Sequence, residues 1–326
     1  MKTIQCITVL ALSLAIPATA GFRMEITDEP WHLAGFENPL DLSAVAAATR
    51  TMLLVGSDEM FHVQPGVLDP ETLRIESRGP IALPLEPPDE KAEVDIEGIA
   101  WSAETSAYYV TGSHGVGKKK GDVQPARLTL FRVPADADGS IRREDITRTS
   151  LEPWFEQTPE LEPYLHAPLQ KNGLNIEGLA ARDGKLFIGL RAPNIGGDGI
   201  VLELPADVPF TGAPAAMKLH RIALGEGRGI REIVAVEGGF ILATGNASAP
   251  PSKKIPVSKV EHPDTRFDLR FWNGRDPRAE MLGTLPQNGG KAEGLLVLHE
   301  TRDRIKLLVV FDSLLAGEPM GVVIHR

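Results

Sequence analysis

The chain has 326 residues and a formal net charge of −10 at pH 7. An acidic balance argues against nucleic acid or an anionic membrane as the partner surface, because both carry negative charge. The single cysteine is Cys6, so the rest of the chain forms no internal disulfide and must be stabilised by burial of a core.

Residues 1–20 have the pattern of a secretory signal peptide. Lys2 gives a positive start, residues 4–16 are largely apolar, and Ala18-Thr19-Ala20 offers the small residues that signal peptidase requires. The apolar stretch is short for a bilayer span, and no later segment approaches its length. We therefore expect cleavage after Ala20, one domain over residues 21–326 without a membrane span, and a periplasmic or secreted location.

One strand pattern then occurs five times along the chain. Each copy has a short apolar-rich strand, followed at a nearly constant distance by a second apolar strand that ends in a polar residue. The first strands are residues 41–46, 95–100, 175–180, 229–234 and 291–296, and the second strands are residues 52–58, 108–114, 186–191, 240–246 and 307–312. Weaker third and fourth strands are visible at residues 128–133, 200–204, 217–222, 267–272 and 279–285.

The repeats have the spacing of propeller blades. Their starts, counted from Asp41 to Asp95, Asn175, Gly229 and Lys291, lie 54, 80, 54 and 62 residues apart. Neither end completes a blade alone, because three strands begin at or after Lys291 and one strand, residues 23–26, precedes the first repeat. We therefore predict an all-β propeller of five blades, closed by pairing of the N- and C-terminal strands, which removes the exposed sheet edges. Six blades are the alternative, because the 80-residue interval has room for a degenerate blade.

Three insertions interrupt the repeats. Residues 113–124 are polar, while residues 152–172 and 249–264 are rich in proline. The two proline-rich insertions are longer than ordinary hairpin loops. Each is either an elaboration over one face of the propeller or a surface excursion.

The repeated Asp/Asn-Ile-Glu-Gly-Ile/Leu-Ala segments, together with residues 184–191 and 229–233, resemble a bacterial family known only as a domain of unknown function, related to the esterase-like phytase propellers. The resemblance covers nearly all of the chain after residue 20 and implies a propeller without an established reaction. The segment Glu97-Gly98-Ile99-Ala100-Trp101 is also similar to the Glu-Gly strand of gluconolactonases and paraoxonases, which implies that Glu97 helps to hold a divalent cation. The chain departs from this pattern at Ser43 and Arg231, which stand where other repeats have Glu.

Alignment of the repeats predicts a ring of polar side chains at one mouth of the central channel. The first strand of each blade lines that channel, so equivalent positions should meet. Position three of the first strand is Ser43, Glu97, Glu177, Arg231 and Glu293, and the end of the second strand is Asp58, His114, Arg191, Asn246 and Asp312. Crowded carboxylates raise their pKa values, pair with arginine or bind a cation.

Each kind of side chain in the ring has a candidate role. Oxygen ligands without sulfur favour Ca²⁺ or Mg²⁺, and the candidate ligands are Glu97, Glu177, Glu293, Asp58 and Asp312. Imidazole titrates near neutrality, so His114 is the candidate general acid or base, with Glu97 and Glu177 as further candidate catalytic residues. The candidates for holding an anionic ligand are Arg191, Arg231 and Asn246. The alternative for the Glu residues is structural, because a Glu at a strand start can accept backbone N–H bonds from the next blade.

Two functions therefore stay open. One is a divalent-metal-assisted hydrolase of phosphate or carboxylic esters, in which the metal activates water and an arginine holds the anion. The other is a non-catalytic propeller that binds a small, anionic ligand or a partner. The sequence has neither a Gly-x-Ser-x-Gly elbow nor a His-Glu-x-x-His motif, so serine hydrolase and zincin chemistry lose their usual support.

Overall fold

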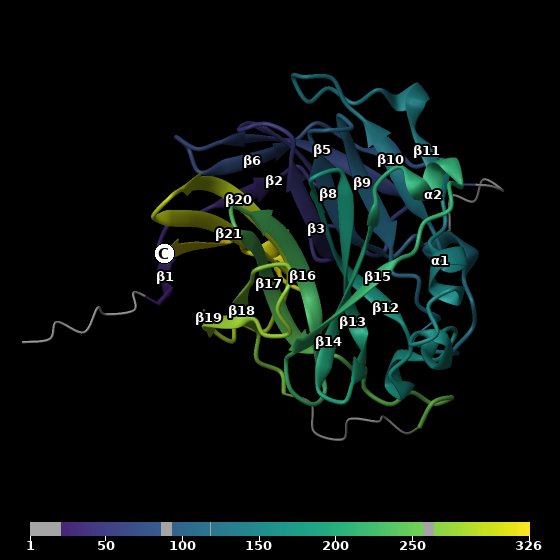
Figure 1. The fold of residues 1–326 in the computed structure, drawn as a ribbon. Coiled ribbons are helices and arrows are strands. Elements are labelled where there is room, and N and C mark those ends of the chain that lie inside the picture. Colours follow the sequence, from purple (N-terminus) through teal and green to yellow (C-terminus); the bar gives the residue numbers. More distant parts are fainter. Residues whose placement is uncertain (1–20, 86–92, 118, 257–263) are drawn as a thin grey trace, which may run out of the picture.

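A computed structural model describes residues 21–85, 93–117, 119–256 and 264–326. The predicted signal peptide lies outside the described residues. Five sheets surround a central axis (Figure 1), and the first predicted strand of every repeat is the innermost strand of its sheet. The prediction of a five-bladed β-propeller is confirmed.

The blades are numbered here in chain order. Blade one contains β3 (Leu42–Ala47), β4 (Met52–Ser57), β5 (His62–Asp69) and β6 (Arg74–Ser77), with β2 (His32–Ala34) parallel to β6 and β7 (Ile81–Ala82) paired with β5. Blade two contains β8 (Ile96–Ser102), β9 (Ala107–Gly112), β10 (Leu130–Pro134) and β11 (Thr147–Thr149). Blade three contains β12 (Asn175–Arg182), β13 (Lys185–Ile195), β14 (Asp198–Pro205) and β15 (Lys218–Ala223). Blade four contains β16 (Arg228–Val236), β17 (Gly239–Asn246), β18 (Asp268–Trp272) and β19 (Glu280–Thr284). Blade five contains β20 (Lys291–Thr301), β21 (Arg304–Asp312), β22 (Met320–His325) and β1 (Arg23–Thr27).

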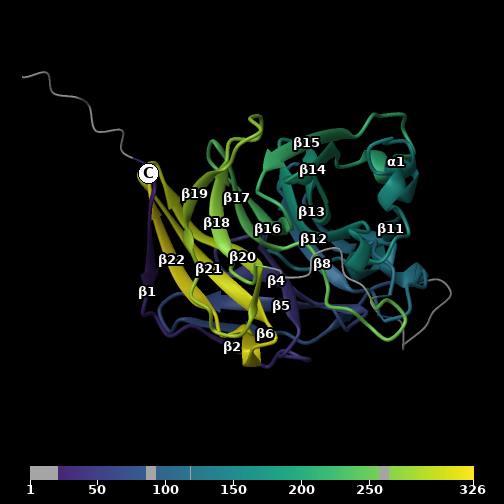
Figure 2. The ribbon, with the colours of Figure 1, turned by 90° about the horizontal axis from the view of Figure 1, so that it is seen from below.

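The ring is closed by the two ends of the described chain. Strand β1 runs antiparallel to β22, in a register that pairs Arg23 with His325 and Thr27 with Gly321, and the two strands lie side by side in Figure 2. Phe22 anchors the start of β1, because its ring lies 4.8 Å from that of Phe271 in blade four. Terminal closure is therefore confirmed.

The long interval between the second and third repeats does not hold a sixth blade. Residues 126–172 contribute β10, β11, the helix α1 (Glu152–Glu156) and short 3-10 turns rather than a sheet of their own. Trp154 and Phe155 of α1 are buried in the apolar core that blades two and three share. The first proline-rich insertion is thus a packed part of the core. It also contacts the second insertion, because Gln170 Nε2 donates a hydrogen bond of 3.1 Å to the carbonyl of Pro250.

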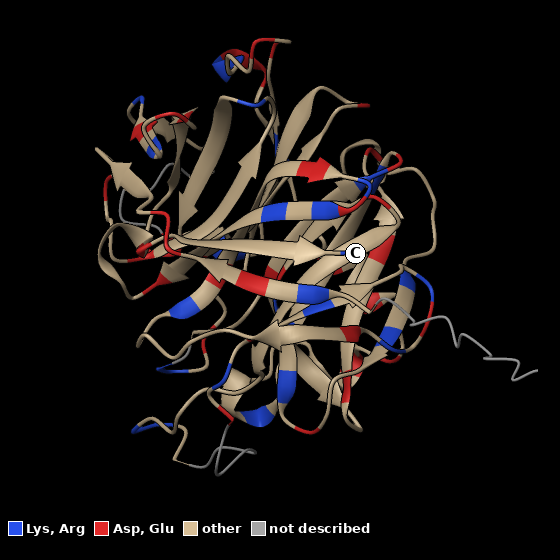
Figure 3. Cartoon of the chain, turned by 90° about the vertical axis from the view of Figure 1, so that its left-hand side faces the viewer, with Lys and Arg blue, Asp and Glu red and all other residues tan. Residues whose placement is uncertain are grey.

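The few helical segments are short. Among the described residues, the other helical segments are α2 (Val208–Thr211) and 3-10 turns at Pro125–Arg127, Arg143–Asp145, Glu162–Tyr164, Leu169–Lys171 and Leu315–Gly317. In the described part of the chain, no helix has the length and apolar character of a membrane span. Acidic and basic residues are interspersed along the strands and loops (Figure 3), while most of the buried side chains are apolar.

A β-bulge in every innermost strand explains the repeated sequence pattern. The register shifts at position three in all five blades, so one residue there is left without a ladder partner. The next position must be small where neighbouring inner strands converge, since a Cβ on Gly98 would lie 2.8 Å from Cβ of Leu179. A Cβ on Gly178 would likewise lie 2.9 Å from the backbone nitrogen of Ile233. In the Glu-Gly pair, the Glu is therefore the bulged residue, and the Gly allows the inner strands of two blades to approach closely.

Candidate functional site

The bulges direct five buried side chains toward one mouth of the central channel. They are the predicted position-three residues Ser43, Glu97, Glu177, Arg231 and Glu293, all of which are buried. Ser43 Oγ donates a hydrogen bond of 2.5 Å to the carbonyl of Ile96 and so joins blade one to blade two.

Arg231 is the centre of a buried ion-pair network. Its Nε lies 2.7 Å from Oε2 of Glu177 in blade three, and its Nη2 donates to Oε1 of Glu293 in blade five. The guanidinium therefore connects three consecutive blades. Sequence reasoning offered a bound cation or arginine–carboxylate pairs between blades, and the described residues form the pairs.

Arg191, within β13, extends this network. Its Nη1 donates a hydrogen bond of 2.6 Å to Oε1 of Glu177. Its Nε donates to the carbonyl of Asn246 at 3.2 Å, and its Nη2 donates to the carbonyl of Ser248 at 2.7 Å. Arg191 and Arg231 thus share one carboxylate, and both are held rigidly.

Burial and neighbouring charges act on Arg231 in opposite directions. Burial, followed by the positive charge of Arg191, lowers the pKa of Arg231 to about 10, while Glu177, Glu97 and Asp312 raise it. The guanidinium therefore stays charged at neutral pH. Asp312, at the end of β21, also forms an ion pair with Lys291 at the start of β20.

A cavity of about 420 Å³ opens beside the network, between blades four and five. We call it the basic cavity, because the charged side chains among its described lining residues are all basic: Arg191, Arg231 and Lys291. The remaining lining residues are Asn246, Ser248, Pro250, Thr265, Phe267, Pro286, Gln287, Gly289 and Gly290. The paired carboxylates Glu177, Glu293 and Asp312 are not among the lining residues. Their side chains are 0%, 5% and 2% exposed, and Arg231 itself is 2% exposed, so it borders the cavity from a buried position. The three residues predicted to bind an anionic ligand therefore line one cavity together.

His114 has a different setting from that of the charged network. Its Nε2 accepts the N–H of Leu151 at 3.2 Å, so its Nδ1 carries the proton and donates to the carbonyl of Gly112 at 3.1 Å. Burial lowers the pKa of His114 to about 4, which leaves the ring neutral at physiological pH. Its ring packs edge-on against Phe155. These contacts hold α1 and its flanking loop against blade two. A role of His114 as general acid or base stays a prediction.

The carboxylates predicted to bind calcium are not gathered into one ligand set. Among the described residues, no group of three or more His, Cys, Asp and Glu side chains is arranged to hold a metal ion. Glu177 and Glu293 face arginines, and Asp58 is half-buried beyond β4, where its N–H donates to the carbonyl of Asp41 at 3.2 Å. We therefore derive no step through a metal, and calcium binding stays a prediction.

Glu232 is a buried carboxyl that sequence reasoning passed over. It stands where other blades have Gly or Ala, and its Oε1 accepts the N–H groups of Ile233 at 2.7 Å and of Leu179, in blade three, at 3.3 Å. Burial raises the pKa of Glu232 well above its ordinary value. The sequence left open a hydrogen bond between a position-three Glu and the backbone of the next blade. Glu232 makes such a contact instead. The break in the Glu-Gly pattern at residues 231–232 was the available signal.

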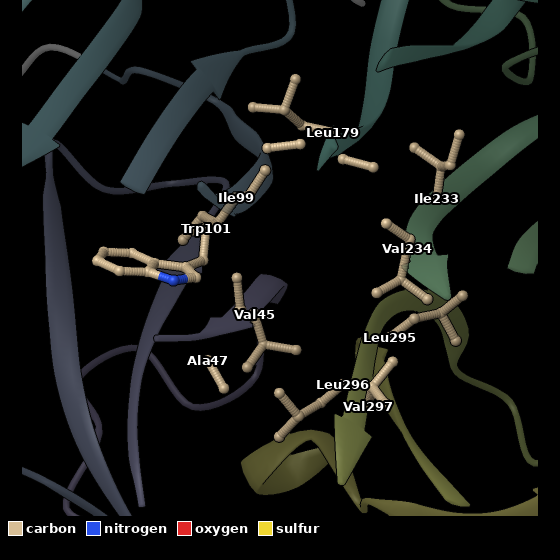
Figure 4. Close-up of a pocket in the computed structure, with 15 residues that line it drawn as sticks. Val45, Ala47, Ile99, Trp101, Leu179, Ile233, Val234, Leu295, Leu296 and Val297 are labelled. Carbon is tan, nitrogen blue, oxygen red and sulfur yellow. The ribbon is translucent and has the colours of Figure 1, made fainter. Parts of the chain in front are cut away.

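The opposite mouth of the channel is apolar. A cavity of about 200 Å³ there is lined by three consecutive residues from each of β3, β8, β12, β16 and β20. Figure 4 shows these side chains, among them Val45, Ile99 and Leu295, around a common opening, with the Trp101 ring at its edge. The two ends of the channel therefore differ, and the charged chemistry is confined to the end where the inner strands begin.

Lys291 and Phe267 were also missed as site residues. Lys291 is position one of the fifth repeat. The residue at position one varies between blades as much as the residue at position three, so this variation was the available signal. Phe267 was assigned only to a strand, and its sequence gives no sign that it faces a cavity.

Comparison with known proteins gives a family and a set of structures of the same general kind. Residues 41–135 and 135–318 match the family described as "Protein of unknown function (DUF3616)". No curated protein sequence matches the chain. Similar solved structures include the periplasmic gluconolactonase of Pseudomonas aeruginosa, with 13% identity over 86% of this chain and 67% of that chain and a TM-score of 0.40. Others are the PQQ-bound aldose sugar dehydrogenase from Streptomyces coelicolor (13% identity, 94% and 98% covered, TM-score 0.41) and the RRP9 WD40 repeats (9% identity, 93% and 98% covered, TM-score 0.44).

Proposed function

Because the chain belongs to the DUF3616 family of unknown function, we propose its function from its own site: the propeller binds a small anionic ligand, a carboxylate or a phosphate ester, in the basic cavity. The observation that carries the proposal is the lining of that cavity. In a protein of net charge −10, the charged residues described there are Arg191, Arg231 and Lys291.

The two arginines are suited to this role because they are already fixed in position. A guanidinium has five N–H donors, and the bonds of Arg191 to Glu177, Asn246 and Ser248 use three of them among the described residues. Arginine binds carboxylate and phosphate groups through paired donors. A side chain that is held before the ligand arrives loses little conformational entropy on binding.

Lys291 supplies a cation at the rim of the cavity. Its side chain is 48% exposed, and its ion pair with the buried Asp312 holds it beside the opening. An exposed cation attracts anions from solution, and the attraction weakens as salt is added.

Ligand binding is better supported than ester hydrolysis. Proton transfer in hydrolysis is usually performed by His, Asp or Glu, and none of these lines the basic cavity among the described residues. Glu177, the carboxylate that pairs with both arginines, has a fully buried side chain. The non-catalytic alternative is therefore our proposal, and hydrolysis stays a prediction.

Calorimetric titration with inorganic phosphate and with acetate tests the proposal. We expect saturable binding that weakens with added sodium chloride. Lys291→Gln should weaken binding by about 10- to 100-fold, because a hydrogen bond to a charged group contributes about 1.5–3 kcal/mol. Lys185→Gln is the matched control, since Lys185 is 46% exposed and pairs with Glu203 but lies outside the basic cavity. Absence of saturable binding of both anions by the wild type, or equal losses in the two variants, would refute the proposal.

A further inference from the structure

The basic cavity has a second, uncharged wall. Pro250, Phe267 and Pro286 line it together with the basic residues. Its volume of about 420 Å³ falls within the range of organic-ligand pockets, which is about 300–1,000 Å³. An inorganic anion held by the arginines would leave most of this space unfilled.

Phe267 lies next to Arg231. A Cβ built on Gly245 of β17 would lie 2.8 Å from Cε1 of Phe267, so the ring packs closely over that glycine. The guanidinium carbon of Arg231 lies 5.9 Å from the ring centroid. The ring is half-buried and its remaining surface contributes to the cavity. An anionic group bound by Arg231 would therefore place the adjoining part of the ligand beside an aromatic ring.

We infer that the ligand is an organic anion whose carboxylate or phosphate group is attached to a planar ring, with the anionic group on Arg191, Arg231 and Lys291 and the ring against Phe267. The inference rests on the proposed function. Aromatic rings prefer offset-stacked or edge-to-face contact with one another, which adds to the gain from burial of apolar surface. The polar side chains of Asn246, Thr265 and Gln287 at the same cavity can hydrogen bond to ring substituents.

Two pairs of ligands separate the ring from the anionic group. Binding of phenyl phosphate is compared with that of inorganic phosphate, and binding of benzoate with that of acetate, by titration calorimetry on the wild-type protein. We expect each ring-bearing ligand to bind about tenfold tighter than its partner, because an aromatic contact and the burial that accompanies it contribute on the order of one power of ten. This comparison requires no variant to fold.

Phe267→Leu then tests the ring contact. This substitution should remove most of the advantage of phenyl phosphate while leaving the affinity for inorganic phosphate within about twofold. Phe271→Leu is the matched control, because Phe271 is also half-buried and lies in the same blade but contacts Phe22 at a different cavity. Benzyl alcohol, a ring without charge, should bind far more weakly than benzoate.

The outcomes distinguish the two proposals. Equal affinities within each pair, or a ring advantage that survives Phe267→Leu unchanged, would overturn this inference while anion binding stands. Binding of benzyl alcohol as tight as that of benzoate would overturn it as well. No binding of any of the four anions would overturn both proposals.

Discussion

Glu177 is the carboxylate on which both arginines of the site depend, and Glu177→Gln removes its charge with little change of shape. In the wild type, Nη1 of Arg191 and Nε of Arg231 lie 2.6 Å and 2.7 Å from the two carboxylate oxygens of Glu177. Gln carries no charge and replaces one of these oxygens with an NH2 donor, so it cannot pair with both arginines. Arg231 is left with Glu293 and the carbonyl of Asn246, and Arg191 with the carbonyls of Asn246 and Ser248. Removing one partner of a buried ion pair costs about 3–5 kcal/mol, because a buried charge is left uncompensated.

This cost can be converted into a change of melting temperature. Unfolding entropy of about 2.1 cal/mol/K per residue gives about 0.7 kcal/mol/K for 326 residues. We therefore expect Glu177→Gln to lower Tm by about 4–7 °C in scanning calorimetry. The control is Glu76→Gln, because Glu76 pairs with Arg74 at 3.3 Å on the surface, where both side chains are largely exposed. A surface pair contributes about 0–1 kcal/mol, so this control should shift Tm by less than about 1.5 °C.

The same melts in calcium and in EDTA separate the ion-pair network from the predicted calcium site. The network predicts the same loss of stability in both buffers. A calcium site that includes Glu177 predicts a calcium-dependent rise of the wild-type Tm that disappears in Glu177→Gln. A variant that melts within about 1 °C of the wild type in both buffers would show that the buried pairs do not hold the blades together.

Three further predictions concern the rest of the propeller. Burial raises the pKa of Glu232. At a pH between the ordinary pKa and the raised pKa, the native state keeps a proton that the unfolded chain has lost, so the free energy of unfolding of the wild type falls as pH rises. Glu232→Gln should therefore gain stability relative to the wild type between pH 5 and pH 8 in urea unfolding, and an equal difference at both pH values would contradict the raised pKa. Burial lowers the pKa of His114 to about 4, so the free energy of unfolding should decrease by about 3 kcal/mol in full as pH falls from about 6.5 to 4. In urea unfolding, His114→Asn should reduce this dependence on pH, whereas substitution of the exposed His32 by Asn should leave it unchanged. Deletion of residues 21–27, which removes β1, should expose the edge of β22 and cause aggregation that light scattering detects; a deletion variant that stays monomeric and melts like the intact chain would speak against a stabilising role for the closure.

The sequence was sufficient to predict the architecture because propeller blades repeat. Every inner strand and its partner were located from one polar-apolar pattern, and counting strands at the two ends predicted the closure by β1 and β22. The outer strands of blade one, β5 and β6, were not predicted. Outer strands lie away from the channel, where no shared neighbour imposes a common sequence, so they carry little repetition.

The sequence predicted which residues lie together at the site better than it predicted how they interact. Equivalent positions of the inner strands do bring Glu177, Arg231 and Glu293 together, as the repeat alignment predicted. Whether such carboxylates pair with arginine or bind a cation depends on the distances between side chains of neighbouring blades. The spacing of residues in the sequence does not give these distances. His114 illustrates the same limit, because only the path of residues 150–156 supplies the backbone N–H that occupies its Nε2.

The basic cavity arises where one blade departs from the repeat. Blades two, three and five have Glu followed by Gly at the bulge, whereas blade four has Arg231 followed by Glu232. The exchange places a cation between the Glu residues of the two flanking blades, so their charges are compensated across both interfaces. Glu232 then bonds to the backbone of blade three at the position where a glycine would otherwise permit close approach. Restoring the repeat with the double substitution Arg231→Glu and Glu232→Gly would bring three carboxylates together and leave Arg191, bonded to Glu177, as the arginine that still compensates them. Like charges in a buried site repel strongly. A Glu in blade four would therefore leave the carboxylates at the bulges poorly compensated. The departure from the repeat that stabilises the blade interfaces also leaves Arg231 beside the basic cavity.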